Sequence, residues 1–435
     1  MTVIAQARSF IHWGIAHGVP RAVLRAAARR GDIQANLIAS SHDAKRGVDD
    51  PVFGIIEEIR AQGPMNSSSF SRLTADHALV REVLTSNDFR TGIPGRTGAL
   101  GRIADATAPR TVHPVEAPSL LVTEPPDHTR YRKLVMKVFT MRKVEALRSR
   151  TQAIADELLD ELKGRDHVDL VEAYCARLPV TVIAQILGVP DSQQQRVLEF
   201  GAAAAPSLDL GLPWSQYRTV DRALADFDGW LGEHLEYLRR HPGDNLLSDL
   251  VAVRDQDGGL NETELRSTAG LVLAAGFETT VNLLSNGIAL LHDNPDQLAV
   301  LRDDPSLWSN TVEEVLRLDP PVLLTGRACI RETEIGGQRI RAGDLVTTLL
   351  AGANRDPAVF TDPARFDVAR ENAREHLSFS AGRHHCLGAM LARMEGEVGL
   401  RSIFERYPDL TLLPGAHRRS TRILRGFEVL PARMG

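Results

Sequence analysis

Cysteine, long apolar runs and an excess of charge of one sign are all scarce in this sequence. The 435 residues include 3 cysteines; they are widely spaced and odd in number, which indicates a reducing compartment and excludes a C-x-x-C zinc or redox motif. The longest apolar runs, such as residues 271–277, fall far short of the roughly 20 residues that a membrane-spanning helix needs. We therefore expect no membrane span and a location in the cytoplasm.

The charge balance and composition are those of an ordinary folded protein. Lys and Arg total 51 and Asp and Glu total 56, which gives a formal net charge of −5, so the overall field provides no electrostatic reason to bind nucleic acid. Hydrophobic residues make up 43% and charged residues 25% of the chain, which argues against a disordered or disulfide-scaffold protein. Neither a repeat nor a long linker divides the sequence, so we expect one domain over residues 1–435.

The N-terminal 31 residues carry five arginines and no acidic residue, a bias shared by transit peptides and interfacial helices. Gly14, Gly18 and Pro20 are expected to interrupt any single amphipathic helix in this segment. No small-residue cleavage site follows a long apolar core. We therefore interpret the segment as the start of the mature fold, with a helix end at residues 29–32.

Helical periodicity dominates between residues 127 and 320. The clearest helix runs from Asn261 to about His292, because Asn261 with Glu264 forms a capping-box pattern. A helix of this length spans roughly 45 Å and can cross a whole domain.

The β structure predicted by the sequence is small and follows this helical region. Gly336-Gly337 fits a hairpin turn, and residues 345–350 are β-branched and aliphatic. A long irregular segment at 352–385 precedes a last helix at about 387–407. The predicted fold class is mainly α with a small β region.

Residues 379–388 read FSAGRHHCLG and place Cys386 in a loop directly before the last predicted helix. Backbone N–H groups at a helix N-terminus, together with Arg383 and His384, favour a thiolate, the form that binds metal. Gly388 allows close approach of the backbone to a flat ligand. The alternative is an inert buried cysteine, the commoner case for a lone Cys.

This F-x-x-G-x-H-x-C-x-G pattern resembles the haem-binding loop of the cytochrome P450 family. The resemblance implies that Cys386 is the axial ligand of haem b iron, and that Phe379 and Gly388 contact the cofactor. It also implies that His384 hydrogen-bonds a haem propionate. Ser380 stands where many members have glycine, a departure that leaves the ligand assignment intact.

Residues 275–280 of the long helix read AGFETT. A glycine in mid-helix costs about 1 kcal/mol relative to alanine, so Gly276 suggests close approach by another group. The alternative is a helix packed against a helix, with Glu278 exposed and the threonines bonding back to the chain. The segment is similar to the P450 [AG]-G-x-[DE]-T-[ST] pattern, which implies that Ala275 and Gly276 lie over the haem and that Glu278 and Thr279 deliver protons during O₂ activation.

His128 and Arg132 share one face of a helix that Asp127 is expected to cap. The alternative is a basic solvated face that binds nothing. In the P450 family, H-x-x-x-R at this place binds haem propionates, and Arg327 matches another propionate-binding arginine. The resemblance therefore implies four cations around two carboxylates, since His384 joins these three.

Glu314 and Arg317 form an E-x-x-R pattern that alone favours nothing more than an exposed ion pair. Its place about 70 residues before the cysteine resembles the structural E-x-x-R of the P450 family. Arg365 matches the third partner, so that one acid is shared by two guanidiniums. The role implied is architectural.

The resemblance is clearest from about residue 50 and implies a P450 fold, with haem between a long central helix and a cysteine-bearing loop. It implies a monooxygenase that uses O₂ to hydroxylate a small molecule. The candidate pocket walls are small or apolar, which favours a hydrophobic substrate; they are residues 91–126, 202–214, 273–275 and 323–324. The alternatives are a haem-thiolate peroxygenase or isomerase, and a non-catalytic haem sensor.

Electrons are expected to come from other proteins. Only two cysteines remain besides Cys386, too few for an iron–sulfur cluster, so we expect a ferredoxin and a ferredoxin reductase as partners. Arg130, Lys133 and Lys137 lie off the His128/Arg132 face and are candidates for steering an acidic donor. Ordinary surface positions explain them equally well.

Overall fold

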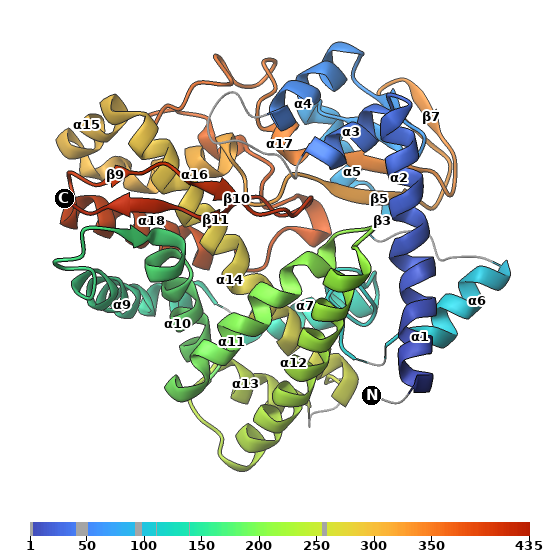
Figure 1. The fold of residues 1–435 in the computed structure, drawn as a ribbon, viewed down its shortest axis with the longest axis horizontal. Coiled ribbons are helices and arrows are strands. Elements are labelled where there is room, and N and C mark those ends of the chain that lie inside the picture. Colours follow the sequence, from blue (N-terminus) through green and yellow to red (C-terminus); the bar gives the residue numbers. More distant parts are fainter. Residues whose placement is uncertain (1–2, 41–50, 92–97, 110, 139, 255–258) are drawn as a thin grey trace.

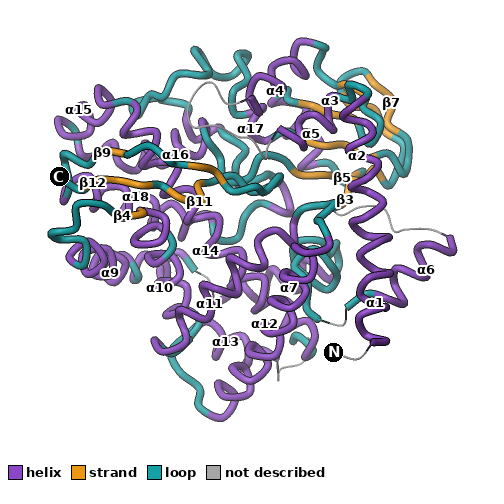
Figure 2. The backbone as a smooth tube through the Cα atoms, in the orientation of Figure 1, coloured by secondary structure: helices purple, strands orange, loops and turns teal. Residues whose placement is uncertain are grey.

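The computed structural model describes residues 3–40, 51–91, 98–109, 111–138, 140–254 and 259–435 (Figure 1). Helices dominate this part of the chain and short strands gather in small sheets (Figure 2). The fold class predicted from the sequence is thereby confirmed. The helices of the N-terminal third are α1 (Val3–Trp13), α2 (Val19–Arg29), α3 (Ile33–Ser40), α4 (Pro51–Ala61), α5 (His77–Thr85), α6 (Gly98–Thr107) and α7 (Asp127–Val138).

The remaining helices build the body of the molecule around one central helix. They are α8 (Met141–Ala146), α9 (Arg148–Asp160), α10 (Arg177–Ile186), α11 (Asp191–Ala204), α12 (Trp214–Arg240), α13 (Leu246–Arg254), α14 (Glu262–Asp293), α15 (Pro295–Asp303), α16 (Trp308–Leu318), α17 (Leu350–Ala353) and α18 (Ala389–Arg406). The last helix begins three residues after Cys386, as the sequence predicts.

The main sheet has five strands in the order β1-β2-β8-β5-β3, with only β2 and β8 parallel. Its strands are β1 (Asn66–Ser67), β2 (Arg72–Thr74), β3 (Phe89–Arg90), β5 (Thr325–Cys329) and β8 (Leu345–Thr348). The predicted hairpin is present as β6 (Thr333–Ile335) and β7 (Gln338–Ile340), and both glycines between them have positive φ. Two smaller sheets contain β4 (Val168–Asp169), β9 (Thr411–Leu412), β10 (His417–Arg418), β11 (Phe427–Val429) and β12 (Pro431–Arg433).

The central helix α14 has 32 residues and crosses the molecule (Figure 1). Asn261 caps it: its side chain accepts from the Glu264 N–H at 3.0 Å, and the Glu264 carboxylate accepts from the Asn261 N–H at 2.9 Å. The predicted capping box is therefore confirmed. Most residues of α14 after Leu265 are buried, because other helices pack around it.

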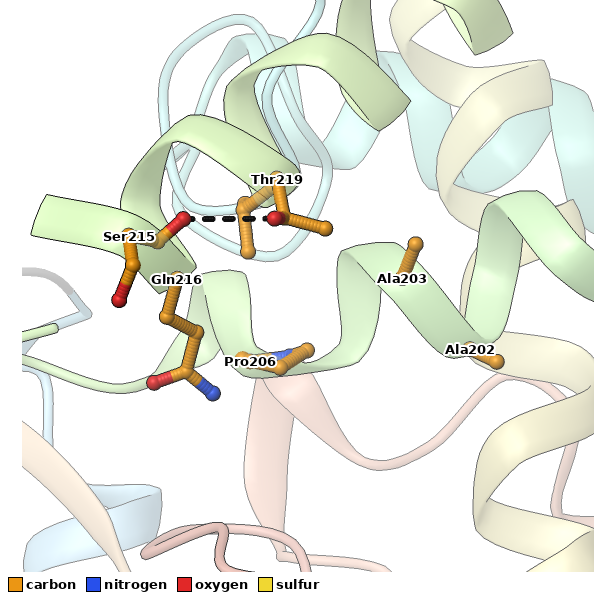
Figure 3. A pocket seen from close by; sticks show the side chains of 7 residues that line it. Ala202, Ala203, Pro206, Ser215, Gln216 and Thr219 are labelled. Carbon is orange, nitrogen blue, oxygen red and sulfur yellow. Dashed lines mark hydrogen bonds between the residues drawn. The ribbon is translucent and has the colours of Figure 1, made fainter. Parts of the chain in front are cut away.

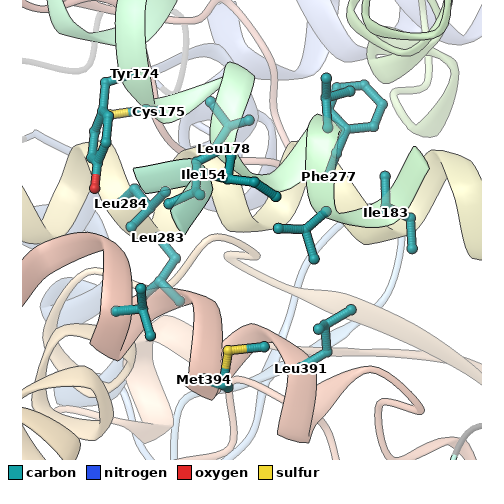
Figure 4. Close-up of a cluster of buried hydrophobic side chains, with 14 of the residues drawn as sticks. Ile154, Tyr174, Cys175, Leu178, Ile183, Phe277, Leu283, Leu284, Leu391 and Met394 are labelled. Atoms are coloured by element: carbon teal, nitrogen blue, oxygen red, sulfur yellow. The ribbon is translucent and has the colours of Figure 1, made fainter. Parts of the chain in front are cut away.

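The hydrophobic core lies where α10, α14 and α18 meet. Figure 4 shows Leu178, Phe277, Leu284 and Met394 among the side chains of this cluster. The packing is close enough that a Cβ at Gly287 would lie 2.7 Å from Leu400 Cδ1. This contact fixes α14 against α18, the helix that follows the cysteine loop.

The expectation that glycine and proline break the N-terminal helix is wrong. Helix α1, a π-helical turn at Gly14–Gly18 and α2 follow one another without an irregular residue. Pro20 is tolerated because it lies in the first turn of α2, where its missing N–H costs little. The predicted helix end is confirmed, since α2 stops at Arg29 and Gly31 has φ of +83°.

Two local expectations also need correction. Asp127 is the first residue of α7 rather than its cap, since the His128 N–H already bonds the Glu124 carbonyl at 3.1 Å. The segment at 202–214 is largely helical: α11 continues to Ala204 and a 3₁₀ turn at Ala205–Leu208 follows. Of the segment at 91–126, residues 92–97 and 110 lie outside the described residues.

Among the residues described, no helix by itself has the length and apolar composition to cross a membrane. One helical pair, Val171–Ile186 and Asp191–Leu208, meets both criteria together and is bent by 119° at its break.

Candidate functional site

The loop that carries Cys386 is held in a tight conformation. The Cys386 N–H donates to the Phe379 carbonyl at 2.9 Å and closes the loop. Gly382 has φ of +68°, and a Cβ there would lie 2.8 Å from the Leu84 carbonyl oxygen. Only glycine meets both conditions, so this position fixes the path of the chain towards the cysteine.

The Cys386 thiol is accessible but lies among protein groups that change its pKa. Burial raises the pKa of the thiol, while the Gly388 N–H and the guanidiniums of Arg132 and Arg393 lower it. The two cations expected from the sequence, Arg383 and His384, are not among the groups that lower this pKa, so their effect on the thiol stays a prediction.

Arg393 was not anticipated by the sequence argument. It comes from α18, lies over the Phe379 ring at 4.5 Å from its centre, and donates to the Glu313 carboxylate at 2.9 Å. Its position one helical turn beyond the cysteine loop was the available signal.

The predicted pair of histidines meets in space. The ring centres of His128 and His384 are 4.4 Å apart, although they come from α7 and the cysteine loop. Burial, together with the charges of His384 and Arg132, lowers the pKa of His128 to about 4. His128 Nε2 is buried and has no hydrogen-bond partner among the described residues. This nitrogen therefore needs a polar partner that those residues do not provide.

Arg327 joins this cluster from β5. Its side chain is buried, and its Nη1 donates to Thr325 Oγ1 at 3.0 Å and to the Gly326 carbonyl at 2.9 Å. Burial lowers the pKa of Arg327 to about 10, against the opposite effect of the Glu124 charge.

Glu124 is the acid of the cluster, and the sequence argument missed it. Its carboxylate lies 3.0 Å from Arg383 Nη1 and 3.2 Å from His384 Nε2, and it accepts from the Thr91 N–H at 2.7 Å. Burial would raise the pKa of Glu124, but the bonds from His384 and Thr91 hold it at about 2. An acid directly before Pro125-Pro126 at the start of α7 was the signal to notice.

The cluster fits a ligand that carries carboxylates. His128, Arg132, Arg327 and His384 gather near one another as predicted, and Glu124 alone does not balance the positive charge of the arginines around it. A buried cation and an unpartnered ring nitrogen are stable when an anion completes their hydrogen bonds. The donor set at the thiol and at this cluster therefore fits haem with its two propionates.

The AGFETT segment occupies the middle of α14. Ala275 is exposed, whereas Phe277, Glu278 and Thr280 close to it are buried. Thr279 Oγ1 donates to the Ala275 carbonyl at 3.0 Å, which is the back-bonded geometry of the helix-packing alternative. A Cβ at Gly276 would lie 3.1 Å from Ile183 Cδ1, so in this structure the group closest to that glycine belongs to α10.

Glu278 is buried rather than exposed, and its partner comes from far along the chain. Its Oε1 lies 3.1 Å from Nε of Arg419, next to β10, in an ion pair that lacks hydrogen-bond geometry. Burial raises the pKa of Glu278, and the Arg419 charge lowers it. The exposed-helix alternative for Glu278 is therefore wrong.

The E-x-x-R pair is fully buried, as the resemblance implies, but its third partner differs. Arg317 bonds Glu314 at 2.6 and 2.8 Å, and the second guanidinium on Glu314 is that of Arg370, at 3.1 Å. Arg365 is exposed and contributes only its carbonyl, which accepts from both arginines at 3.0 Å. The prediction for Arg365 is wrong, since this irregular segment turns its side chain outwards.

A pocket of about 400 Å³ lies elsewhere, between α11 and α12 (Figure 3). It is lined by Ala202, Pro206, Ser215, Gln216 and Thr219. The first two belong to the segment at 202–214 that the sequence predicts to line the substrate pocket, whereas none of the predicted haem-binding or proton-transfer residues lines it. Thr219 Oγ1 donates to the Ser215 carbonyl at 3.3 Å, the same back-bonded geometry as that of Thr279.

Comparisons with known proteins show which family this chain resembles. The family model described as Cytochrome P450 matches residues 206–425. "Putative cytochrome P450 140" of Mycobacterium tuberculosis is 51% identical over 431 residues, which cover 98% of this chain and 97% of the relative. "6-deoxyerythronolide B hydroxylase" of Saccharopolyspora erythraea is 42% identical over 330 residues, 75% of this chain and 80% of the relative.

A solved structure has the same architecture. The crystal structure of P450BioI in complex with hexadec-9Z-enoic acid ligated acyl carrier protein has a TM-score of 0.80 and 29% identity, and the match covers 88% of this chain and 98% of that one.

Proposed function

Because this chain belongs to the cytochrome P450 family and is therefore a haem monooxygenase, we propose that residues 1–435 form one domain that hydroxylates a hydrophobic small molecule. The observation that carries the proposal is that the Cys386 thiol and four basic side chains come together from three segments far apart in the sequence, namely the cysteine loop, α7 and β5. In this proposal the Cys386 sulfur would hold the haem iron, and Phe379, Gly388, Ala275 and Gly276 would line the cofactor.

Bound haem supplies the redox-active iron that activates O₂. The protein then has to hold the sulfur of Cys386 as an anion. The Gly388 N–H and the charges of Arg132 and Arg393 support this, because each lowers the pKa of the thiol against the effect of burial. The thiolate is the form of Cys386 that would hold the iron.

The basic cluster is proposed to bind the haem propionates. His128 and Arg327 are buried and offer donors that the described residues leave without a carboxylate partner of their own, while His384 also contacts Glu124. Carboxylates placed there would form charge-assisted hydrogen bonds. The cluster thereby orients the cofactor.

Glu278 and Thr279 are proposed to handle protons. Since burial raises the pKa of Glu278, its carboxyl holds a proton over a wider pH range than an exposed glutamate does, and the Arg419 charge favours its release. The Thr279 hydroxyl donates to the Ala275 carbonyl, so it has to leave that bond before it can donate to another oxygen.

Electrons are proposed to come from a ferredoxin and its reductase. Lys133 and Lys137 are exposed on α7, the helix that carries Arg132 to the thiol. Arg130 is engaged by Glu264 at 2.7 Å and is not available for steering. The steering role therefore falls to the two lysines in this proposal.

The substrate class rests on the apolar residues of the predicted pocket walls and on two names. One relative is named as a 6-deoxyerythronolide B hydroxylase, and the P450BioI structure contains a hexadec-9Z-enoic acid chain. We propose a hydrophobic substrate of comparable chemistry for this chain. We also propose a cytoplasmic location, because Cys175, Cys329 and Cys386 are all free thiols.

The ligand assignment is tested by the absorption spectrum of the reduced, carbon monoxide-treated holoprotein. A red-shifted Soret band that disappears in Cys386→Ser supports it. A colourless protein after expression with ample haem precursor overturns it.

The proton roles are tested with Thr279→Ala and Glu278→Gln, supplied with ferredoxin, reductase and a substrate found by spectral shifts. Both variants should consume electrons while losing product. Thr219→Ala is the matched control, since it removes the same back-bond on α12. Full activity in both site variants favours the peroxygenase or isomerase, and haem binding without substrate-dependent O₂ consumption favours the sensor.

A further inference from the structure

The N-terminal helices present an apolar face to solvent. Phe10 is 52% exposed, Ile11 46%, Val19 61% and Val23 47%. Between residues 6 and 26 the exposed residues are otherwise three alanines, Gln6 and Arg25. In Figure 1 α1 and α2 run along one side of the molecule, with α6 beside α1, and the exposed fractions show that the rest of the described chain leaves this face open.

The π-helical turn keeps this face continuous. Each residue of an α-helix advances by about 100°, so Val19 would stand about 180° from Phe10 in an uninterrupted α-helix. The wider turn at Gly14–Gly18 takes up about one extra residue. Val19, Ala22, Val23 and Ala26 therefore line up with Ala7, Phe10 and Ile11, over a length of about 28 Å.

The opposite side of these helices is tied firmly to the fold. His12 Nδ1 lies 3.1 Å from the Ala104 carbonyl, Trp13 Nε1 donates to the Leu212 carbonyl at 2.9 Å, and Arg21 donates to the Gly211 carbonyl at 3.1 Å. The buried residues Ala16 and Ala27 lie on this side. The protein thus holds the apolar face outwards.

The charges of the N-terminal segment itself have one sign, although elements packed against α1 place two acids beside it: Asp221 accepts from Ser9 Oγ at 3.4 Å, and Asp105 is exposed on α6. No acidic residue occurs before Asp32, and Arg25, Arg29 and Arg30 are exposed at the end of α2. The whole chain has a net charge of −5, so the positive charge is local. A second copy of the same face offers these arginines no carboxylate, whereas the surface of an anionic membrane offers them negatively charged headgroups.

We propose that the face formed by α1 and α2 docks in the plane of a bilayer that contains anionic lipids. Apolar side chains along one side of a helix enter the headgroup boundary, and arginines beside them add attraction to anionic headgroups. The helix lies on the membrane and does not cross it. This inference requires no step of the proposed reaction.

The test is sedimentation of the full-length holoprotein with vesicles of phosphatidylcholine, alone or with one third phosphatidylglycerol. The wild type should sediment with the anionic vesicles and remain in the supernatant with the neutral ones. Replacing Arg25, Arg29 and Arg30 with Gln should weaken binding about fivefold per arginine. The variant I11Q/V19Q/V23Q should weaken binding by more than tenfold, because it removes apolar side chains of the face. Glutamine preserves helix propensity, so the helices themselves should remain.

The matched control is M141Q/V300Q/I330Q, which removes three equally apolar side chains that are 70%, 37% and 49% exposed outside this face. This control should bind as the wild type does, and an unchanged Soret spectrum should show that it and I11Q/V19Q/V23Q are folded. The proposal is overturned when the wild type does not bind, or when I11Q/V19Q/V23Q binds as well as M141Q/V300Q/I330Q. A dimer without lipid that only I11Q/V19Q/V23Q abolishes would assign the face to a second copy instead.

Discussion

Replacing Arg370 with methionine should cost much more stability than the same change at Arg365. The Arg370 guanidinium is buried, lies 3.1 Å from the Glu314 carboxylate and donates to the Thr361 carbonyl at 2.7 Å. Removing one member of a buried ion pair costs about 3–5 kcal/mol. Because Glu314 retains Arg317 at 2.6 Å, we expect the lower end of that range, about 3 kcal/mol.

Arg365→Met is the matched control. The Arg365 side chain is exposed, and only its carbonyl takes part in the network, so this substitution leaves the hydrogen bonds intact. Exposed substitutions of this kind usually change the free energy of unfolding by less than about 0.5 kcal/mol.

Urea unfolding of the two variants and the wild type, followed by circular dichroism and the Soret band, measures the difference. The midpoint should fall for Arg370→Met with little change in the slope, since the same surface is exposed on unfolding. A double-mutant cycle with Glu314→Gln should give a coupling energy of about 1–3 kcal/mol. Equal losses at the two arginines, or a coupling energy near zero, would refute the buried network as described.

Three further outcomes follow from the site. The bonds from His376 and Arg393 outweigh burial and hold the pKa of Glu313 at about 2. The stabilisation by this carboxylate is therefore complete above its ordinary pKa near 4.5 and is lost as the pH falls through 2. A difference in melting temperature between the wild type and Glu313→Gln that stays constant over this pH range would contradict this. Gly382→Ala should lower the ratio of haem to protein, because the new Cβ meets the Leu84 carbonyl at 2.8 Å; full haem content would show that the loop adapts. Arg419→Gln should raise the pKa of Glu278 further, so that the infrared band of its protonated carboxyl disappears at a higher pH than in the wild type. An unchanged titration of this band would show that Arg419 does not lower the pKa of Glu278.

Features set by neighbours in sequence could be predicted. The cap of α14 needs only Asn261 and Glu264, three residues apart on one chain segment, and both hydrogen bonds form as expected. The hairpin at Gly336-Gly337 is equally local. Such patterns fix backbone geometry before any tertiary contact is made.

Partners brought in by tertiary packing could not be predicted from local patterns. Glu278 is a recognisable acid, but its ion pair is with Arg419, which reaches α14 only after the C-terminal strands fold back. Glu314 needs a second guanidinium, and nothing in the spacing distinguishes Arg365 from Arg370 in an irregular segment. The residue types of the site can therefore be predicted from the sequence, whereas the charged partners that shift their pKa values depend on the fold.

The N-terminal segment shows how a local rule can mislead when helix geometry itself changes. Gly14, Gly18 and Pro20 disfavour an α-helix, and the chain does leave the α-helical pattern between Gly14 and Gly18. A π-turn accommodates these residues without ending the helix, because Pro20 lies in the first turn of α2, where its missing N–H costs little. A helix interrupted by a loop would scatter the exposed apolar residues over several directions, whereas the π-turn aligns them on one face. That alignment is the reason to test this face, rather than the arginines alone, against a membrane surface.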